Sequence, residues 1–589
     1  MTAISLAGRI DAVLIETFAS LDLPVRFAWS TASGRADLAD RQCNGAMAAA
    51  KELGRNPRDV AGAIASALSS RPEFSEVSVA GPGFVNMRLS ATFLAEVAQA
   101  QADDPDLGLA KTAIPERIVV DFGGPNVAKP LHVGHLRSLV IGESLRRILL
   151  SCGHHVLSDV HLGDWGLQMG QLISELEIRQ PRLPYFDAAF AGPYPATPPV
   201  TLADLEAMYP AAAKACNEDP VRLDAARKAT ADLQTGRAGY RALWDAFRKL
   251  SLAAQKRDFD ELGAHFDLFG GESDAAPLIE QLIIRLIAKG IADRSDGAVV
   301  VAVAEPADRK PMPPLLLAKA DGAALYATTD LATLEDRVTR LGADRIIYVV
   351  DQRQALHFEQ VFRAARKADL APSGKLEHVG FGTVNGTDGK ALKTRDGGTV
   401  KLADLLSEAV VMASKRLEAS DQKNDMPATE RAALARQIGI AAVKFADLSN
   451  NRMSGYVFDP ERLVSFEGKT GPYLQYACVR IASILEKAVE RSEVIGPLSL
   501  GHPAERALAL ECLRFPEVVA SAATALLPSE IADYAFGLAQ RFSRFYVDCP
   551  VLGEADREMR ASRLALSSLS HAVLSRALWM LGIEVPERM

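Results

Sequence analysis

The stretch that decides the fold is "RIVVDFGGPNVAKPLHVGHLRS", residues 117–138, which passes from an apolar run into a segment rich in glycine, proline and histidine. The run RIVVDF is typical of a buried strand, and the residues after His135 place apolar side chains at helical spacing. We therefore expect a strand that leads into a helix at the carboxyl edge of a sheet. Open α/β sheets bind their ligands at this edge.

Three further apolar runs extend this pattern, at residues 154–162, 344–351 and 376–384. Helical patterns alternate with them, and that order predicts a parallel sheet with right-handed crossovers. Strand signals vanish after about residue 405. The expected fold class is therefore multidomain, with an α/β part around this sheet followed by an all-α part.

Changes of composition divide the 589 residues into three expected domains. Residues 1–110 mix helical patterns with short strands and predict a small N-terminal α+β domain. Residues 111–405 hold the parallel sheet, with an Ala-rich helical insertion at about 181–262 that has a Pro-rich lead-in. Residues 406–589 are predicted to be helical.

Bulk composition excludes several classes of protein. Apolar residues make up 48% of the chain and charged residues 24%, as in ordinary globular proteins, and no apolar run reaches the length of about 18 residues that a membrane span needs. The N-terminus lacks a basic leader, so we expect a cytoplasmic protein. Six scattered cysteines without a C-x-x-C pair argue against a disulfide framework and a structural zinc site and predict buried free thiols. The net charge of −8 predicts no general affinity for nucleic acid, so such a role requires local sites.

His132 and His135 lie three residues apart at the expected helix start and would share one side of its first turn. Free N–H groups and the positive dipole end make such a start an anion site. Gly134 has no Cβ and would let a flat group pack against the backbone. The arrangement suits a nucleoside triphosphate attacked at its α-phosphate, with imidazole N–H groups stabilising the transition state. The alternative is a pair of capping histidines with ordinary turn glycines.

A second cationic element, "GKALKTRDGG" at residues 389–398, follows the last strand of the sheet. Its cations include Lys393 and Arg395, and they could close over a triphosphate and neutralise the leaving pyrophosphate. The alternative is a solvated basic hairpin, because charged glycine-rich loops are common.

These segments resemble a known family. H-x-G-H after the first strand of a Rossmann-like sheet is similar to the nucleotide-binding motif of class I aminoacyl-tRNA synthetases, and "PNVAKPLHVGHLRS" resembles the arginyl-tRNA synthetases. The resemblance continues in order over nearly the whole chain, through "HLGDWGLQMGQLI", "FDLFGGES", "YATTDLA", "KALKTRDGGTVKLADLL", "TGPYLQYACVRI" and "LGIEVPERM". It implies a Rossmann-like catalytic domain, an N-terminal domain that binds the tRNA elbow, and a C-terminal helical-bundle domain that binds the anticodon.

The same resemblance implies a reaction and its partners. ATP-dependent ligation of L-arginine to its tRNA would proceed through an arginyl-adenylate, with Mg²⁺ on the ATP phosphates and no zinc. The enzyme would be a monomer that does not bind membranes, and arginine activation would wait for tRNA. Two alternatives stay open: another nucleotidyltransferase with H-x-G-H, or a tRNA-binding relative without catalysis.

For ATP, the resemblance points to His132, Gly134 and His135 and to a degenerate form of the family's KMSKS loop, with Leu392-Lys393-Thr394 where many members have Met-Ser-Lys. The expected second lysine of that loop is missing. Lys129, just upstream of the histidines, would supply its charge. Lys129, Lys393 and Arg395 would then neutralise the pyrophosphate.

For arginine, a planar cation that favours carboxylates and flat acceptors, the resemblance points to five residues. They are Asp121, Asn126, Tyr326, Asp330 and Gln354. The acids would pair with the guanidinium, while the two amides would reach the α-amino and carboxylate groups. The glutamine contact lies within residues 352–354. Gly123-Gly124 departs from the serine or alanine pair of many members, and four further histidines are expected to be structural: His154, His155, His161 and His357.

For tRNA, residues 451–589 contain 15 Lys and Arg against 17 Asp and Glu, so no general positive field is expected there. Thirteen of the fifteen are arginine, and "RFSRFY" at 541–546 interleaves arginines with aromatic rings that could stack on bases, although Phe542 and Phe545 could equally be core. The resemblance places six residues near tRNA: Tyr473, Tyr476, Tyr546 and Met589 at the anticodon loop, and Phe84 and Asn86 at the elbow.

Overall fold

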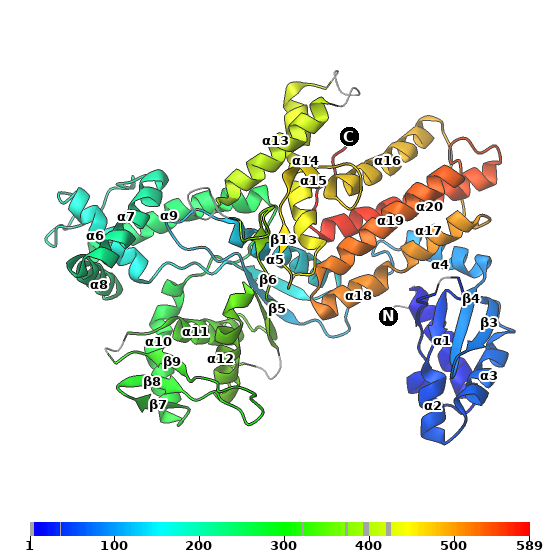
Figure 1. Cartoon of the computed structure of the whole chain (residues 1–589), viewed down its shortest axis with the longest axis horizontal. Coiled ribbons are helices and arrows are strands. Elements are labelled where there is room, and N and C mark those ends of the chain that lie inside the picture. The colour runs from blue at the N-terminus through cyan, green and yellow to red at the C-terminus, as the bar shows by residue number, and fades with distance from the viewer. Residues whose placement is uncertain (1–4, 36, 321–322, 372–374, 393–399, 420–425) are drawn as a thin grey trace.

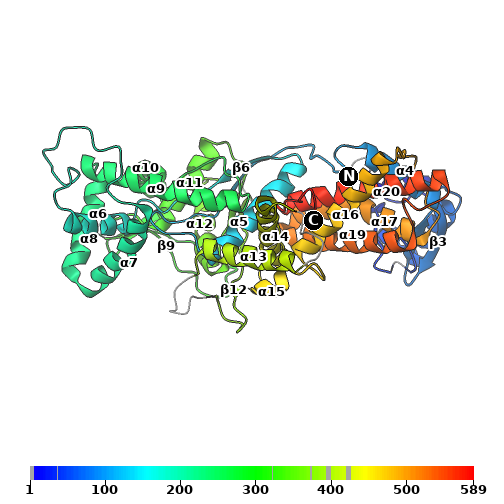
Figure 2. The same ribbon diagram turned by 90° about the horizontal axis from the view of Figure 1, so that it is seen from above.

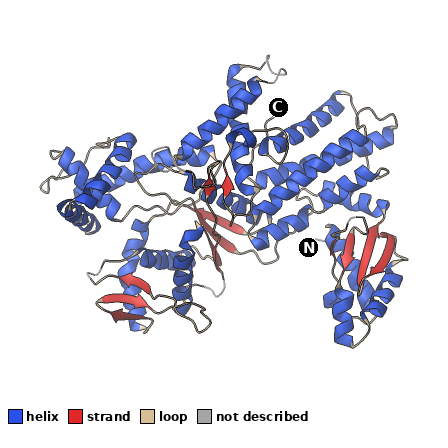
Figure 3. Cartoon of the chain, in the orientation of Figure 1, coloured by secondary structure: helices blue, strands red, loops and turns tan. Residues whose placement is uncertain are grey.

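The computed structural model describes residues 5–35, 37–320, 323–371, 375–392, 400–419 and 426–589. The molecule is elongated, with a helical insertion at one end and an α+β domain, formed by the first part of the chain, at the other (Figure 1; Figure 2). The parallel sheet lies between them, next to a row of long C-terminal helices. Figure 3 shows that the strands gather in separate small sheets rather than in one large one.

An antiparallel sheet with helices packed against it forms the N-terminal domain. Its strands are ordered β1-β2-β4-β3, and β4 buries Val85, Met87 and Leu89 in the core. Helix α1 begins after Ser5, whose side chain caps it by accepting a hydrogen bond from Gly8 N at 3.2 Å. The elements are α1 (Leu6–Ser20), the 3-10 turn η1 (Val25–Phe27), β1 (Thr31–Ala32), β2 (Arg41–Cys43), α2 (Gly45–Leu53), α3 (Pro57–Leu68), β3 (Phe74–Ala80), β4 (Phe84–Leu89) and α4 (Ala91–Asp103).

The central sheet has the order β6-β5-β10-β11, and all three pairs of neighbours are parallel. Ile118 and Val120 of β5 pack into the core that includes α5, whereas Val119 packs into the core of α11 and α12. Both faces are thus covered, which confirms the parallel sheet expected from the β-α alternation. Its elements are β5 (Arg117–Phe122), α5 (Val133–Ser151), β6 (His155–Asp159), α11 (Tyr326–Thr339), β10 (Arg345–Val349), the 3-10 turn η2 (Gln352–Gln354), α12 (Ala355–Lys367) and β11 (Leu376–His378).

Between β6 and α11 the chain forms a helical insertion and a small antiparallel sheet. Leu205, Leu243 and Phe247 belong to a core that the insertion helices build among themselves and share with Val127 and Ala128 of the segment after β5. The insertion helices are α6 (Leu167–Arg179), α7 (Leu202–Glu218), α8 (Pro220–Gln234) and α9 (Ala238–Glu261). Then follow α10 (Glu272–Ala288) and the strands β7 (Ala292–Ser295), β8 (Ala298–Val301) and β9 (Leu315–Ala318).

Among its described residues, the C-terminal part is helical, as predicted, with one exception. The two-residue strand β13 (Tyr456–Val457) pairs in parallel with β12 (Val384–Asn385), and so short a strand leaves no periodic signal in the sequence. The helices are α13 (Leu402–Glu418), α14 (Ala428–Leu448), α15 (Pro460–Leu463), α16 (Gly471–Glu490), α17 (Pro503–Leu513), α18 (Phe515–Ala525), α19 (Pro528–Asp548) and α20 (Arg557–Met580).

Two features of the composition have structural counterparts. The six cysteines are free thiols, and five of them are buried, with Cys152 half-buried. No helix within the described residues has the length and apolarity needed to cross a membrane.

Candidate active site

The two histidines form the cap of α5 at the carboxyl edge of the parallel sheet. His132 is the N-cap residue, and its Nδ1 accepts a hydrogen bond from Gly134 N at 3.0 Å. His135 reaches back, and its Nδ1 accepts from His132 N at 3.0 Å. Because a neutral imidazole carries its proton on the nitrogen that does not accept, both rings hold it on Nε2. The ring centroids are 3.9 Å apart, so two N–H donors lie side by side.

The surroundings keep both rings neutral. Burial, and then the charges of Lys129 and Arg353, lower the pKa of His132. Burial, with a smaller contribution from His132, lowers the pKa of His135 to about 3. Neutral imidazoles at physiological pH donate hydrogen bonds without requiring a proton from solvent.

Gly134 is required by the cap itself. A Cβ on this residue would lie 2.8 Å from Cε1 and 3.0 Å from Nδ1 of His132, closer than real contacts allow. The sequence suggested that a flat group packs on this glycine, and in the structure the imidazole of His132 lies against it.

The second cationic element lies in part outside the described residues, and both Lys393 and Arg395 fall in that part. Its flanks are anchored. Leu392 N donates to Val384 O at 2.9 Å, and on the other side Val133 N donates to Val400 O at 3.0 Å. Leu402 N donates to Leu131 O at 2.9 Å. The chain that leaves the element thus runs directly along the histidine turn.

Lys129 lies in the loop between β5 and α5, and its charge acts on both histidines. The preceding residue, Ala128, has a φ of 61°, which is unusual for a residue with a side chain. The Lys129 ammonium lies 4.4 Å from the centroid of the Tyr209 ring. The lysine is therefore held at the edge of the site by an aromatic face.

Asp121 is the next-to-last residue of β5 and is buried in an internal ion pair. Nη2 of Arg337 lies 2.5 Å from Asp121 Oδ2 and 2.6 Å from Asp159 Oδ2. Burial would raise the pKa of Asp159, but the guanidinium outweighs it and holds that pKa below its usual value. The Asp121 carboxylate is therefore already paired with a buried cation of the protein itself.

Asn126 lies over Gly163 of the neighbouring strand end. The two residues form a parallel bridge, with Val127 N donating to Gly163 O at 3.0 Å and Gly163 N donating to Pro125 O at 3.1 Å. A Cβ on Gly163 would lie 2.1 Å from Asn126 Oδ1. The position of this amide therefore depends on a glycine in the segment "GDWG".

Tyr326 and Asp330 lie one turn apart at the start of α11. Tyr326 is 68% exposed, and Asp330 Oδ2 lies 2.5 Å from Nε2 of His357. His357, which the sequence assigned to structure, is therefore a direct partner of a predicted site residue. Nothing near His357 in the sequence signals this contact, because Asp330 lies in another helix.

Glu272, the first residue of α10, is a candidate that sequence reasoning missed. Burial raises its pKa to about 7, and the charges of Asp164 and Asp330 add to the shift, although Trp165 N donates to the carboxylate. The charge of Asp330 therefore acts on Glu272. Two acidic side chains lie close together here, and such a pair would stabilise a bound cation. The only hint in the sequence was that Glu272 lies within the segment "FGGES", which resembles the family.

The glutamines of η2 lie where β10 ends. Gln352 N donates to Phe381 O at 3.0 Å, and the Gln352 side chain packs on Gly380, where a Cβ would lie 1.9 Å from Oε1. Gln354 is exposed and is the N-cap residue of α12. Both glutamines are exposed, and Gln352 is in addition bound through its backbone to the segment that follows β11.

His161 is a further group that the sequence assigned to structure. Its two ring nitrogens are buried and have no hydrogen-bond partner in the part of the chain that the structure describes. A Cβ on Gly270 would lie 3.5 Å from its Nδ1 and 3.4 Å from Asp159 Oδ1, which places this ring beside the Asp159 carboxylate.

The residues predicted to contact tRNA differ in accessibility. Tyr476 is 45% exposed, Tyr473 packs on Phe536, and Arg480 lies 4.2 Å from the centroid of the Tyr546 ring. Three others are less open: Phe84 is half-buried, the Asn86 amide is buried and accepts a hydrogen bond from Gln42, and Met589 packs against the α13 and α14 core. Phe542 and Phe545 are buried, so the core alternative is correct for them.

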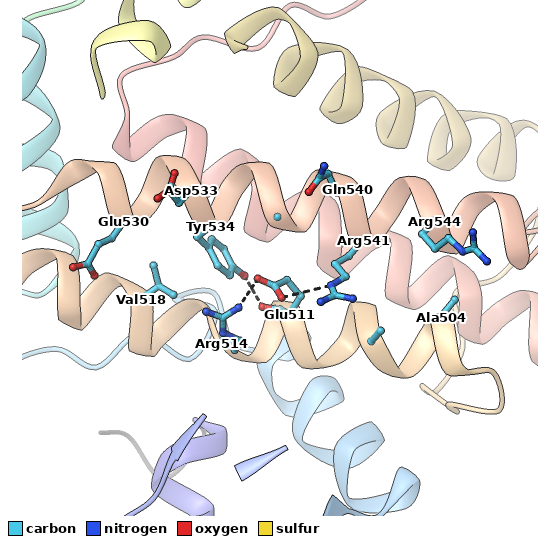
Figure 4. A pocket seen from close by; sticks show the side chains of 12 residues that line it. Ala504, Glu511, Arg514, Val518, Glu530, Asp533, Tyr534, Gln540, Arg541 and Arg544 are labelled. Carbon is cyan, nitrogen blue, oxygen red and sulfur yellow. Dashed lines mark hydrogen bonds and ion pairs between the residues drawn. The ribbon is translucent and has the colours of Figure 1, made fainter. Parts of the chain in front are cut away.

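A cavity of about 590 Å³ opens between α17, α18 and α19 (Figure 4). Glu511 lies 2.9 Å from Arg514 and 4.0 Å from Arg541, and its backbone oxygen accepts from the Tyr534 hydroxyl at 2.8 Å. Arg541 and Arg544 line this cavity, whereas Tyr546 contacts Arg480 on α16. The cations and the ring of "RFSRFY" therefore face different neighbours and do not form one continuous base-stacking surface.

Comparison with known proteins bears on all three parts of the chain. The family models for "tRNA synthetases class I (R), catalytic domain", "DALR anticodon binding domain" and "Arginyl tRNA synthetase N terminal domain" match residues 96–460, 474–589 and 6–89. The arginine–tRNA ligase of Maricaulis maris is 50% identical over 99% of this chain and 100% of its own length, and that of Hyphomonas neptunium is 49% identical over the same shares.

Solved structures match the whole chain as well. The arginyl-tRNA synthetase of Plasmodium falciparum superposes with a TM-score of 0.80 at 25% identity, covering 99% of both chains. That of Thermus thermophilus has a TM-score of 0.79 at 25% identity, covering 99% of this chain and 100% of its own. The histidine turn fits nucleotide chemistry, and the sequence similarity extends from end to end. The chain therefore belongs to the arginyl-tRNA synthetases.

Proposed function

We propose that His132 and His135 act in arginine activation as neutral hydrogen-bond donors to the reacting phosphate. The protein is an arginine–tRNA ligase that uses ATP. An arginine carboxylate oxygen attacks the α-phosphorus in line, the bond from that phosphorus to the bridging oxygen breaks, and pyrophosphate leaves. The observation that supports these roles is that both Nδ1 atoms accept backbone N–H groups, so that each ring presents Nε2–H.

Cations around the histidine turn neutralise the pyrophosphate as it leaves. Lys129 acts from the N-terminal side of α5, and Lys393 and Arg395 act from the loop whose following residues run along that turn. Mg²⁺ would enter on the phosphates of ATP, because Mg²⁺ in such sites is held largely by substrate phosphates, and it would neutralise part of their charge. The amide of Asn126 and that of Gln354 hold the α-amino and carboxylate groups of arginine.

The guanidinium of arginine binds between acidic groups. Asp330 and Glu272 provide the carboxylates, and Tyr326 covers them from the exposed side of α11. Asp121 acts indirectly, since its ion pair with Arg337 fixes the end of β5 beneath the substrate. An acid-lined pocket of this kind discriminates against neutral amino acids because its charges would then be left unpaired.

The adenylate then passes arginine to tRNA. A hydroxyl of the terminal ribose attacks the carbonyl carbon of the adenylate, and AMP leaves. We assign anticodon contacts to Tyr473, Tyr476 and Tyr546 and to the terminal Met589, and elbow contacts to Phe84 and Asn86. We further assign the enzyme to the cytoplasm as a monomer.

Two substitutions of His132 separate its roles in capping and catalysis. Asparagine caps helices well but places no donor where Nε2–H lies, so His132→Asn should fold normally. Its rate of ATP–pyrophosphate exchange with arginine and tRNA present should fall about 10²- to 10³-fold, as when one transition-state donor is removed. In His132→Ala the exchange rate should fall by a similar factor. The free energy of unfolding should fall as well, by about 1 kcal/mol, measured by thermal unfolding. If His132→Asn exchanged pyrophosphate at the wild-type rate, helix capping would be the only role left for this histidine.

A further inference from the structure

Helix α7 of the insertion contacts two lysines that flank the histidine turn, Lys129 and Lys401. Tyr209 lies with its ring 4.4 Å from the Lys129 ammonium, and Glu206 Oε2 lies 2.8 Å from Lys401 Nζ. Glu206 and Tyr209 are three residues apart and therefore share one helix face. Lys401 itself forms an antiparallel bridge with His132. One face of α7 thus spans the distance between the lysine before the histidine turn and the chain that follows the KMSKS-like loop.

This helix is firmly anchored at its N-terminus. Thr201 and Asp204 form a capping box, in which Thr201 N donates to Asp204 Oδ2 at 2.8 Å and Asp204 N donates to Thr201 Oγ1 at 3.2 Å. Leu205 and Met208 are buried in the insertion core. Tyr209 is itself half-buried and packs against the same core, so its ring is held in place rather than free to follow the lysine.

The two contacts differ in what they leave to a ligand. A carboxylate beside a lysine neutralises it and competes with phosphate for its charge, as Glu206 does for Lys401. An aromatic ring attracts the ammonium through its π face and remains uncharged, so the lysine keeps its full charge and the N–H groups that point away from the ring. Lys129 is therefore oriented without being neutralised.

We propose that Tyr209 is a positioning residue for Lys129, and that α7 thereby forms a wall of the site for the triphosphate of ATP. The inference rests on the role proposed above for Lys129 in neutralising pyrophosphate. It assigns to the insertion a part in arginine activation, although the insertion helices lie away from the parallel sheet, whose carboxyl edge holds the histidine turn (Figure 1).

The experiment measures single-turnover adenylate formation by the full-length enzyme, with tRNA and arginine present, as a function of ATP concentration. Tyr209→Leu and Tyr209→Met both remove the ring while keeping an apolar, helix-compatible side chain. We expect each to raise the ATP concentration at half-maximal rate, or to lower the maximal rate, by about 3- to 30-fold, as loss of a cation–π contact predicts. Tyr209→Phe retains the ring and should stay within about twofold of the wild type, and the arginine concentration at half-maximal rate should not change in any of them.

The matched control is Tyr194→Leu, which removes another half-buried tyrosine of the insertion, one that stacks on Tyr185. It should leave the ATP dependence unchanged. Lys129→Ala tests the underlying role separately: a near-wild-type rate would refute the proposed function of Lys129. If Lys129→Ala formed adenylate much more slowly while Tyr209→Leu behaved like the wild type, only the positioning role of Tyr209 would be refuted. The same conclusion would follow if Tyr209→Phe were as impaired as Tyr209→Leu. Adding Tyr209→Leu to Lys129→Ala should cause no further loss.

Discussion

Single residues of the site are predictable where one segment holds the whole motif. His132, Gly134 and His135 lie within four consecutive positions, and their spacing alone brings the two histidine side chains together. The two roles weighed for the histidines are compatible, because capping uses Nδ1 and leaves Nε2–H for a ligand. Glu272 and His357 could not be identified in this way, since each depends on Asp330, which only folding brings near.

Glu272 should make arginine binding depend on pH near neutrality. Burial and the neighbouring acids raise its pKa to about 7, so its carboxylate is charged above that pH and neutral below it. The guanidinium of the substrate stays charged throughout. Arginine affinity measured by calorimetry should therefore weaken as the pH falls from about 8 to about 6, by at most about tenfold per unit. Glu272→Gln should bind arginine weakly with a flatter profile, and a flat wild-type profile would argue against this assignment.

At the scale of elements, a buried ion pair joins the histidine helix to the helical C-terminal part. Arg137 of α5 lies 3.2 Å from Asp447 of α14, donates to Ser454 O at 2.8 Å, and places its guanidinium 5.4 Å from the Tyr456 ring centroid. Tyr456 belongs to β13, which pairs with β12 just before the KMSKS-like loop. The parallel arrangement of the main sheet was predictable from the β-α alternation. This junction was not, because its partners come from separate parts of the chain.

Removing one member of this pair should be costly. The Arg137 and Asp447 side chains are 1% and 0% exposed, so Arg137→Met leaves a buried carboxylate unpaired and should lower the free energy of unfolding by about 3–5 kcal/mol. The double variant Arg137→Met/Asp447→Leu removes both charges and should recover most of that loss. Urea unfolding of the three proteins gives the comparison, and equal stability of the two variants would contradict a coupled pair.

At the scale of the molecule, ion pairs attach the N-terminal domain to the C-terminal helices. Arg506 of α17 binds both oxygens of Asp40, at 2.9 and 2.6 Å, and Arg41 lies 2.6 Å from Glu517 of α18. An N-terminal α+β domain and a helical C-terminal part were predictable from the sequence, but their contact was not. Residues so far apart in the chain reveal their pairing only in three dimensions.

Loosening this attachment should affect tRNA binding more than chemistry. Asp40→Asn leaves the Arg506 guanidinium without its carboxylate, and the concentration of tRNA at half-maximal charging should rise by at least about tenfold. The rate at saturating tRNA should stay close to the wild type. Asp37→Asn is the matched control, because Asp37 pairs with Arg35 on the exposed surface of the same domain. A lowered saturating rate with unchanged tRNA dependence would speak against an anchoring role.

The cap on α5 also bears on metal toxicity. Two histidines a single turn apart resemble a chelating pair, yet coordination of a transition ion such as Zn²⁺ or Ni²⁺ requires an unshared electron pair on a ring nitrogen. On both rings the Nδ1 pair is occupied by a backbone N–H, and Nε2 carries the proton. Capture of an adventitious ion would have to displace a proton or unwind the first turn, so the cap disfavours metal binding by these two histidines.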